Sequence, residues 1–163
     1  MVRVNVAGVA LDGAGQHVIL LTPLEEPGDQ GRVLPIWIGA QEATSILIAV
    51  EGAQPPRPMA HDLMRSLLET LGGAVERVDV TRIEDGTFFA EVTVRRDGDR
   101  WVLDARPSDA VALASRTGAP IFVADDVLED AGVPGSIVRG EEESEVAEFQ
   151  RFLDDVDPED FRG

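Results

Sequence analysis

The sequence contains no cysteine, no lysine and no tyrosine, and only 5% of its 163 residues are aromatic. Without cysteine the chain has neither disulfides nor cysteine-based zinc sites, a composition that fits a cytoplasmic protein. No stretch approaches the roughly 18 consecutive apolar residues of a membrane-spanning helix. The first residues, Met-Val-Arg-Val-Asn-Val, alternate as in a strand and lack the apolar block of a signal peptide. We therefore expect a cytoplasmic protein that does not associate with membranes.

Positive charge is also scarce, because 14 basic residues face 31 acidic ones and give a formal net charge of −17. Such a charge disfavours general nucleic-acid binding by long-range attraction. Residues 141–163 hold ten carboxylates against Arg151 and Arg162, a net of about −8 by residue counting. A locally positive or metal-binding groove therefore remains possible in the rest of the chain.

A length of 163 residues with 44% apolar composition suits one hydrophobic core. Alternating or continuous apolar patterns, separated by glycine-rich and Asp-Gly turns, predict strands. The expected strands cover residues 2–11, 17–22, 33–38, 75–84, 87–96, 100–103 and 120–124. The strands over 75–84, 87–96 and 100–103 follow one another through short turns, which predicts an antiparallel meander.

Apolar residues at helical spacing predict helices over residues 40–52, 60–71, 107–117 and 125–131. The expected fold class is α+β, with a mixed, largely antiparallel sheet packed by helices. Residues 1–135 form the predicted body, and 136–163 form a tail. Val146, Phe149, Phe152, Leu153 and Val156 predict an acidic amphipathic helix in that tail.

The segment Asp104-Ala-Arg-Pro-Ser-Asp-Ala-Val-Ala-Leu-Ala114 joins the last meander strand to a helix. Pro107 suits the first helical position, and Asp109 places a negative charge at the positive end of the helix dipole. Helix propensity does not require Asp104, Arg106 and Asp109 within six positions. We therefore interpret this ionic turn as a candidate site.

Two further helix starts carry ionic residues. Glu42 lies in the first turn of the helix that follows Gly39, and His61 and Asp62 lie in the first turn of the next helix, after Arg57. A first-turn acid is also what the helix dipole alone favours, so Glu42 and Asp62 have a purely structural explanation. Of the two histidines, His61 is the better candidate, because His17 has no ionisable neighbour in the sequence.

Nucleotide-binding and hydrolase signatures are missing: no glycine-rich dinucleotide loop, Walker loop, nucleophile elbow or zinc-spaced set occurs. What remains is a set of hard oxygen ligands, which suit Mg²⁺ or Mn²⁺. We predict Glu42, Asp104 and Asp109 as metal ligands, and His61, Asp62, Asp104 and Asp109 as catalytic residues. Arg57 and Arg106 are the predicted substrate-binding residues, since arginine complements phosphate with two hydrogen bonds.

Several blocks of the chain resemble the bifunctional nuclease domain family. They are Leu34-Pro-Ile-Trp-Ile-Gly39 followed by Glu42-Ala43, Arg57-Pro-Met-Ala-His-Asp-Leu63, Asp85-Gly-Thr-Phe-Phe-Ala90, the segment 104–114 and Pro120-Ile-Phe-Val123. The resemblance covers roughly residues 1–135. One departure is Ala60, where the family usually has a threonine that would cap the helix.

The resemblance implies a mixed α+β fold that forms homo-oligomers, for which we favour a dimer, and it implies cleavage of both DNA and RNA. The first hypothesis is therefore a nuclease with little sequence specificity, assisted by Mg²⁺ or Mn²⁺. The alternative is a non-enzymatic homo-oligomeric scaffold or ligand-binding regulatory module, in which the ionic turn organises a subunit interface. The net charge favours the alternative, whereas the clustered carboxylates and the resemblance favour the nuclease.

Overall fold

The valine-rich N-terminal segment pairs with the apolar segment that follows it, and this pair starts the sheet. The computed structural model describes residues 1–25 and 31–137. In it β2 (His17–Pro23) runs antiparallel to both of its neighbours, β1 (Val2–Leu11) and β3 (Arg32–Ile38). Two short strands complete this half of the sheet, β7 (Ile121–Val123) beside β1 and β8 (Val133–Pro134) beside β3.

The predicted meander forms the other half of the sheet. It consists of β4 (Ala74–Glu84), β5 (Thr87–Arg96) and β6 (Asp99–Ala105). Asp85 and Gly86 both have positive φ at the β4–β5 turn, the conformation that an Asp-Gly hairpin favours. The order in the eight-stranded sheet is β6-β5-β4-β7-β1-β2-β3-β8, and β4–β7 is its parallel pair. The predicted α+β class is confirmed.

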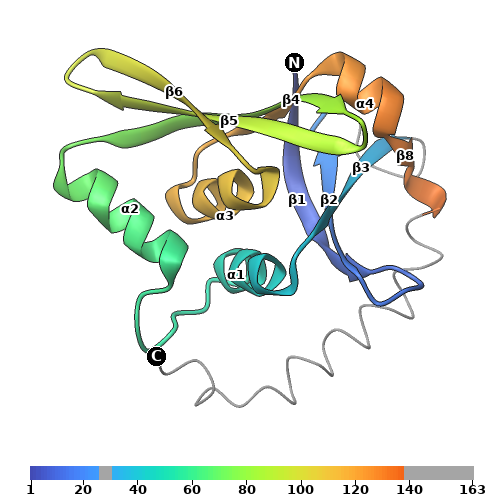
Figure 1. Cartoon of the computed structure of the whole chain (residues 1–163), viewed down its shortest axis with the longest axis horizontal. Helices are drawn as coiled ribbons and strands as arrows, with labels where there is room; N and C mark the ends of the chain where they lie inside the picture. The colour runs from blue at the N-terminus through green and yellow to red at the C-terminus, as the bar shows by residue number, and fades with distance from the viewer. Residues whose placement is uncertain (26–30, 138–163) are drawn as a thin grey trace.

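The helices are α1 (Ala40–Val50), α2 (Ala60–Thr70), α3 (Pro107–Thr117) and α4 (Asp125–Ala131). Helix α3 crosses beneath the sheet, in contact with β4 and β5, while α1 packs beside it and α2 lies beyond it (Figure 1). Three small residues of α3, Ala110, Ala112 and Ala114, are all buried, which lets the helix approach the sheet closely. Helix α4 packs against β3 and β4. Within the described residues, no helix has the length and apolar character needed to cross a membrane.

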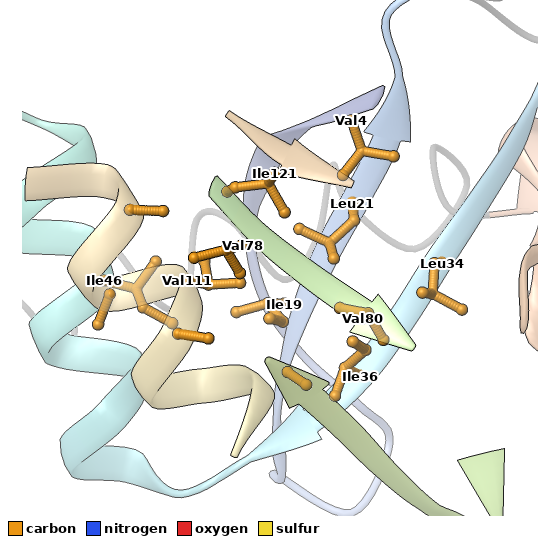
Figure 2. Close-up of a cluster of buried hydrophobic side chains, with 14 of the residues drawn as sticks. Val4, Ile19, Leu21, Leu34, Ile36, Ile46, Val78, Val80, Val111 and Ile121 are labelled. Carbon is orange, nitrogen blue, oxygen red and sulfur yellow. The ribbon is translucent and has the colours of Figure 1, made fainter. Parts of the chain in front are cut away.

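One apolar core joins the two halves of the sheet to the helices. Figure 2 shows Ile46 of α1 and Val111 of α3 facing Val78 of β4 and Ile19 of β2, all of them fully buried. This core fixes the starts of α1 and α3 relative to each other. The predicted tail helix lies outside the described residues.

Candidate functional site

The first turns of α1, α2 and α3 bring together ionic side chains that are far apart in the sequence. Each of these turns carries one acid: Glu42 in α1, Asp62 in α2 and Asp109 in α3. A serine or threonine at the N-cap usually accepts a hydrogen bond from a backbone N–H of the first turn. None of these three helices has such an N-cap residue. The helix starts are instead connected to one another through arginine and histidine.

Arg106, the residue before α3, joins the starts of α1 and α3. Its Nε donates to Oδ2 of Asp109 at 2.9 Å, and its Nη2 donates to Oε1 of Glu42 at 3.0 Å. Gly39 makes room for this arrangement, because the Glu42 carboxylate lies where a Cβ on residue 39 would be. Nη1 of Arg106 makes no hydrogen bond within residues 1–25 and 31–137, and the side chain is 65% exposed. The guanidinium is therefore oriented on one side and accessible on the other.

His61 is buried between the three helices, and both of its ring nitrogens are bonded. Nδ1 lies 2.7 Å from Oγ of Ser45, and Nε2 lies 2.9 Å from Oδ1 of Asp109. Ser45 also accepts a hydrogen bond from Nη2 of Arg116 at 3.0 Å, which leaves its hydroxyl hydrogen for Nδ1. In the neutral imidazole the proton is then on Nε2, where it is donated to Asp109. His61 thus holds the Asp109 carboxylate from the side opposite to Arg106.

Asp62 and Arg116 extend the same network to the far end of α3. Nε of Arg116 donates to Oδ1 of Asp62 at 2.8 Å, while Oδ2 of Asp62 accepts the backbone N–H of Met59 at 2.9 Å. The Arg116 side chain is only 4% exposed, so this ion pair is largely shielded from water. The pair attaches α2 to α3 and does not face a groove with Arg106.

The hydrogen bonds of the network favour the ionised forms of Asp109 and Asp62. Partial burial acts to raise the pKa of Asp109, but hydrogen bonds from Arg106 and His61 outweigh burial and hold the pKa below its ordinary value of 3.8. For Asp62, burial is likewise outweighed by the Met59 N–H and the Arg116 guanidinium, so its pKa is also lowered. The bonds from Asp109 and Glu42 raise the pKa of Arg106. Asp109 and Asp62 are therefore charged at neutral pH.

Four of the predicted site residues, Glu42, His61, Arg106 and Asp109, thus form one connected group. The other three do not join it directly. Asp62 is linked to it only through Arg116 and Ser45. Asp104 is exposed on β6 opposite Glu91, and Arg57 is exposed before α2. Neither side chain makes a hydrogen bond or ion pair with any described residue.

The predicted metal ligands Glu42, Asp104 and Asp109 do not form one cluster of side chains. Among the described residues, no three histidine or carboxylate side chains are grouped so that they could hold a metal ion by themselves. Glu42 and Asp109 are brought together only through Arg106. Mg²⁺ is commonly held by one or two carboxylates together with water and substrate phosphate. A preformed three-carboxylate site of Glu42, Asp104 and Asp109 does not fit this arrangement, whereas Glu42 and Asp109 fit a site that water and substrate phosphate would complete.

A groove of about 610 Å³ opens beside Arg106. Its walls come from three places: the ends of β2 and β3 with His17 and Trp37, the β4–β5 turn with Phe88, and the start of α3 with Arg106. Trp37 is 54% exposed, and its indole N–H donates to Asp12 at 2.9 Å, which orients the ring. This volume is in the range of small-ligand sites in proteins. Phe88 and Arg106 thus line one groove, while the Trp37 side chain extends from its rim on the face of the sheet that carries Val18.

Sequence reasoning missed Ser45, Arg116 and Trp37. Helical spacing contained a signal for the first two: Ser45 lies three residues after Glu42, and Arg116 lies seven residues after Asp109, so each shares a face with a predicted residue. Trp37 lies in a predicted strand, and nothing in the sequence indicates that the end of this strand borders the same groove as the start of α3.

Comparison with known proteins identifies the family. Residues 23–136 match the model of the bifunctional nuclease domain, and this range contains the network, Trp37 and Arg106. An uncharacterized protein of Mycobacterium tuberculosis is 40% identical over 168 residues, covering 99% of each chain. Bifunctional nuclease 2 of Arabidopsis thaliana is 28% identical over 122 residues, and Bifunctional nuclease 1 of Oryza sativa subsp. japonica is 29% identical over 115. These two alignments span 73% and 69% of this chain but only 36% and 34% of the plant proteins. The chain belongs to the bifunctional nuclease domain family.

Proposed function

We propose that the protein is a nuclease that hydrolyses phosphodiester bonds of both DNA and RNA with little sequence specificity. The observation that carries the proposal is the groove beside Arg106, because all of its lining residues except Gln16 and His17 lie within the residues that match the nuclease domain. Family membership supplies the reaction class, and the groove supplies a surface of suitable size and chemistry. The plant relatives named bifunctional nucleases are longer proteins, of which this chain matches about a third.

Arg106 is the proposed phosphate-binding residue. A guanidinium that is held by carboxylates on two of its nitrogens keeps a fixed orientation, and its remaining amino group is free to donate to a phosphate oxygen. Because the pKa of Arg106 is raised, its positive charge persists at every working pH. Arg57, exposed before α2, stays a predicted second phosphate contact.

Trp37, at the rim of the groove on the face that carries Val18, is the proposed platform for a nucleobase. An exposed and oriented indole ring can stack on any base, because every base has an aromatic face. Stacking carries little sequence information, and the groove lining adds few groups that would distinguish one base from another. Weak sequence preference, and tolerance of both DNA and RNA, follow from that kind of contact. Single-stranded substrates expose their bases and are therefore expected to be preferred.

Asp109 is the proposed catalytic carboxylate, and Asp104, exposed on β6, stays a predicted second one. Asp109 is ionised and lies beside Arg106, so it can orient an attacking water as a hydrogen-bond acceptor. Glu42 and Asp109 are the residues that would hold Mg²⁺ or Mn²⁺ together with water and substrate phosphate, and such an ion would supply positive charge next to the phosphate. His61 acts through Asp109, and Asp62 acts through Arg116, so in this proposal both position other groups.

A homo-oligomer and a cytoplasmic location are further parts of this proposal. The alternative function, a non-enzymatic scaffold or ligand-binding regulator, is favoured by one specific observation. The carboxylates of the network are already hydrogen-bonded by Arg106, His61 and Arg116, as in a structural ion-pair network. An activity measurement separates the two.

The test is cleavage of end-labelled single-stranded DNA and RNA by the full chain with Mg²⁺ or Mn²⁺, with and without EDTA. We expect both substrates to be cut, EDTA to stop cleavage, and Asp109→Asn to lower kcat/KM by about 10²-fold or more. Asp104→Asn is compared in the same assay. Asp130→Asn, an exposed carboxylate on α4 outside the groove, is the matched control and should retain wild-type activity.

Two results would reject parts of the proposal. Full activity in both Asp104→Asn and Asp109→Asn would remove the assigned carboxylates while leaving the nuclease. Absence of cleavage with every divalent metal, by protein shown to be folded and free of contaminating nuclease, would instead support the non-enzymatic alternative.

A further inference from the structure

The two edges of the sheet differ in how they are protected. The β8 edge consists of two residues and ends in Pro134, which cannot donate to a further strand. The β6 edge is seven residues long, pairs with β5 without any bulge, and contains no proline or glycine. Its central residues Trp101, Val102 and Leu103 are 47%, 60% and 50% exposed. A long, regular and apolar edge strand is a template for pairing with another strand.

A second exposed apolar surface lies on the same side of the sheet as the helices. Helix α2 buries only His61, and it leaves an apolar stripe in solvent made of Leu63, Met64, Leu67 and Leu71. Trp101 and Leu103 pair with Val94 and Val92, which belong to the core side of the sheet, so their side chains point to the side where α3 and α2 lie (Figure 1). The stripe and the two β6 side chains are thus exposed on one side of the sheet.

The area of this surface is a large part of what a stable interface needs. The six exposed apolar side chains on that side of the sheet, two on β6 and four on α2, are between 44% and 64% exposed. Together they expose on the order of 500 Å², compared with roughly 800 Å² per partner in a typical stable interface, to which the β6 backbone and its charged residues would also contribute. Exposed apolar patches of more than a few hundred Å² mark interaction sites.

The sequence of β6 is complementary to itself in the antiparallel direction. Around Val102 as centre, Trp101 would lie opposite Leu103 of a second copy, and Arg100 would lie opposite Asp104. Opposite charges in directly facing positions stabilise an antiparallel pair, and the two-fold symmetry would produce the Arg100–Asp104 pair twice. Asp104 has no partner among the described residues, and Arg100 reaches Glu76 with its side chain still 68% exposed.

The backbone of β6 is oriented for the same pairing. Asp97 and Gly98 both have positive φ and close the β5–β6 hairpin as a two-residue turn, which is flanked by a hydrogen-bonded pair, Arg96 with Asp99. Because bonded and non-bonded pairs alternate, the N–H and C=O groups of Arg100, Val102 and Asp104 point away from β5. These are the residues that the two-fold axis at Val102 would bring into hydrogen-bonded pairs.

We infer that this chain forms a two-fold symmetric dimer in which β6 pairs antiparallel with β6 of a second copy, centred on Val102, and the α2 stripes pack beneath the joined sheet. This assigns a surface and a register to the proposed homo-oligomer and does not depend on nuclease activity. It also gives Asp104 an interface role separate from any role in cleavage.

The test is the oligomeric state of the full chain by sedimentation equilibrium, over protein concentrations from about 1 to 100 μM, the range that covers a dimer of micromolar affinity. Wild type is expected at twice the chain mass of 17.5 kDa. Arg100→Asp and Asp104→Arg each place like charges opposite one another twice, and each should raise the dimer dissociation constant at least about 30-fold, while the double variant, with the charges exchanged, should recover it to within about threefold. Leu67→Glu should raise it at least as much as either single variant.

Matched controls exclude trivial effects of charge. Arg82→Asp changes an exposed arginine on β4, and Val50→Glu adds a carboxylate at an exposed apolar position ending α1. Both should remain dimeric, and circular dichroism should show that every variant is folded. A monomeric wild type at 100 μM, or a dimer that none of the β6 and α2 variants weakens, would overturn the inference. Single variants that dissociate without recovery in the double variant would contradict the register. Cleavage is measured separately, so loss of nuclease activity has no bearing on these outcomes.

Discussion

Helices α2 and α3 have the same length, 11 residues, and lie next to each other, yet they are attached to the protein in different ways. Helix α3 buries six of its residues, mostly alanine and valine, against the sheet and α1. Helix α2 buries only His61, and it is attached through that histidine, the Asp62–Arg116 pair and a hydrogen bond from Arg65 to the Arg116 carbonyl. The difference shows that α2 is held by directed polar bonds, which leaves its leucines available for another surface.

The largest expected difference between the two helices is the loss of unfolding free energy when an apolar side chain is truncated. Val111→Ala in α3 removes two methyl groups from a fully buried position and should lower the free energy of unfolding by about 2 kcal/mol at every protein concentration. Leu67→Ala in α2 should cost less than about 0.5 kcal/mol at low protein concentration, because the side chain is exposed there. Its cost should rise with concentration if α2 is covered in a dimer. Urea denaturation at two concentrations measures both, and equal losses in the two variants would contradict the comparison.

The next contrast concerns the polar attachment of α2. Ser45→Ala leaves Nδ1 of His61 and one Arg116 N–H without their partner in a buried place, and it should cost about 1–3 kcal/mol. The loss should be visible first in α2, so amide hydrogen exchange should accelerate in residues 60–70 more than in 107–117. Thr44→Ala, on the neighbouring and less buried position of α1, is the control. Uniform acceleration over both helices would mean that α2 is not a separately attached element.

The smallest expected effect is the loss of stability at low pH. The pKa values of Asp109 and Asp62 are lower in the folded chain than their ordinary value of 3.8. Groups with a lowered pKa contribute stability that is fully present above the unfolded pKa and is lost as the pH falls through the folded pKa. Stability from these two groups should therefore be constant from pH 7 to about 5 and fall below about pH 4. Thermal melts of wild type and Asp109→Asn should converge as the pH falls to 3, and a constant difference would contradict the ionised pair.

Much of the fold was predictable because its elements are governed by local patterns. The meander followed from period-two alternation and Asp-Gly turns, and α3 followed from Pro107 with small apolar residues at helical spacing. The parallel pairing of β4 with β7 was not predicted, since it depends on where the chain returns after α3. Nor did the apolar face of α2 reveal that it would be exposed, because periodicity identifies a face but not what covers it.

The candidate site was predictable in composition and only partly in geometry. Sequence reasoning selected Glu42, His61, Arg106 and Asp109, and these four do meet. It grouped His61 with Asp62 because they are adjacent, but on a helix adjacent residues point in different directions, and His61 bonds Asp109 while Asp62 bonds Arg116. It grouped Asp104 with Asp109 because they lie close together in the sequence. Asp104 is on β6 and outside the network, whereas Asp109 is in the first turn of α3. Pairing across helices is a tertiary property that spacing along the chain does not encode.

The most direct test of the central claim, that the groove beside Arg106 binds the phosphate of the substrate, is the kcat/KM of Arg106→Gln on single-stranded DNA and RNA, compared with Arg82→Gln. Arg82 is also an exposed arginine paired with a carboxylate, Glu84, but it lies outside the groove. Loss of a charged hydrogen bond to phosphate, worth about 1.5–3 kcal/mol, predicts a decrease of roughly 10- to 150-fold for Arg106→Gln on both substrates and no change for Arg82→Gln. Equal activity of the two variants, with both folded, would contradict the account.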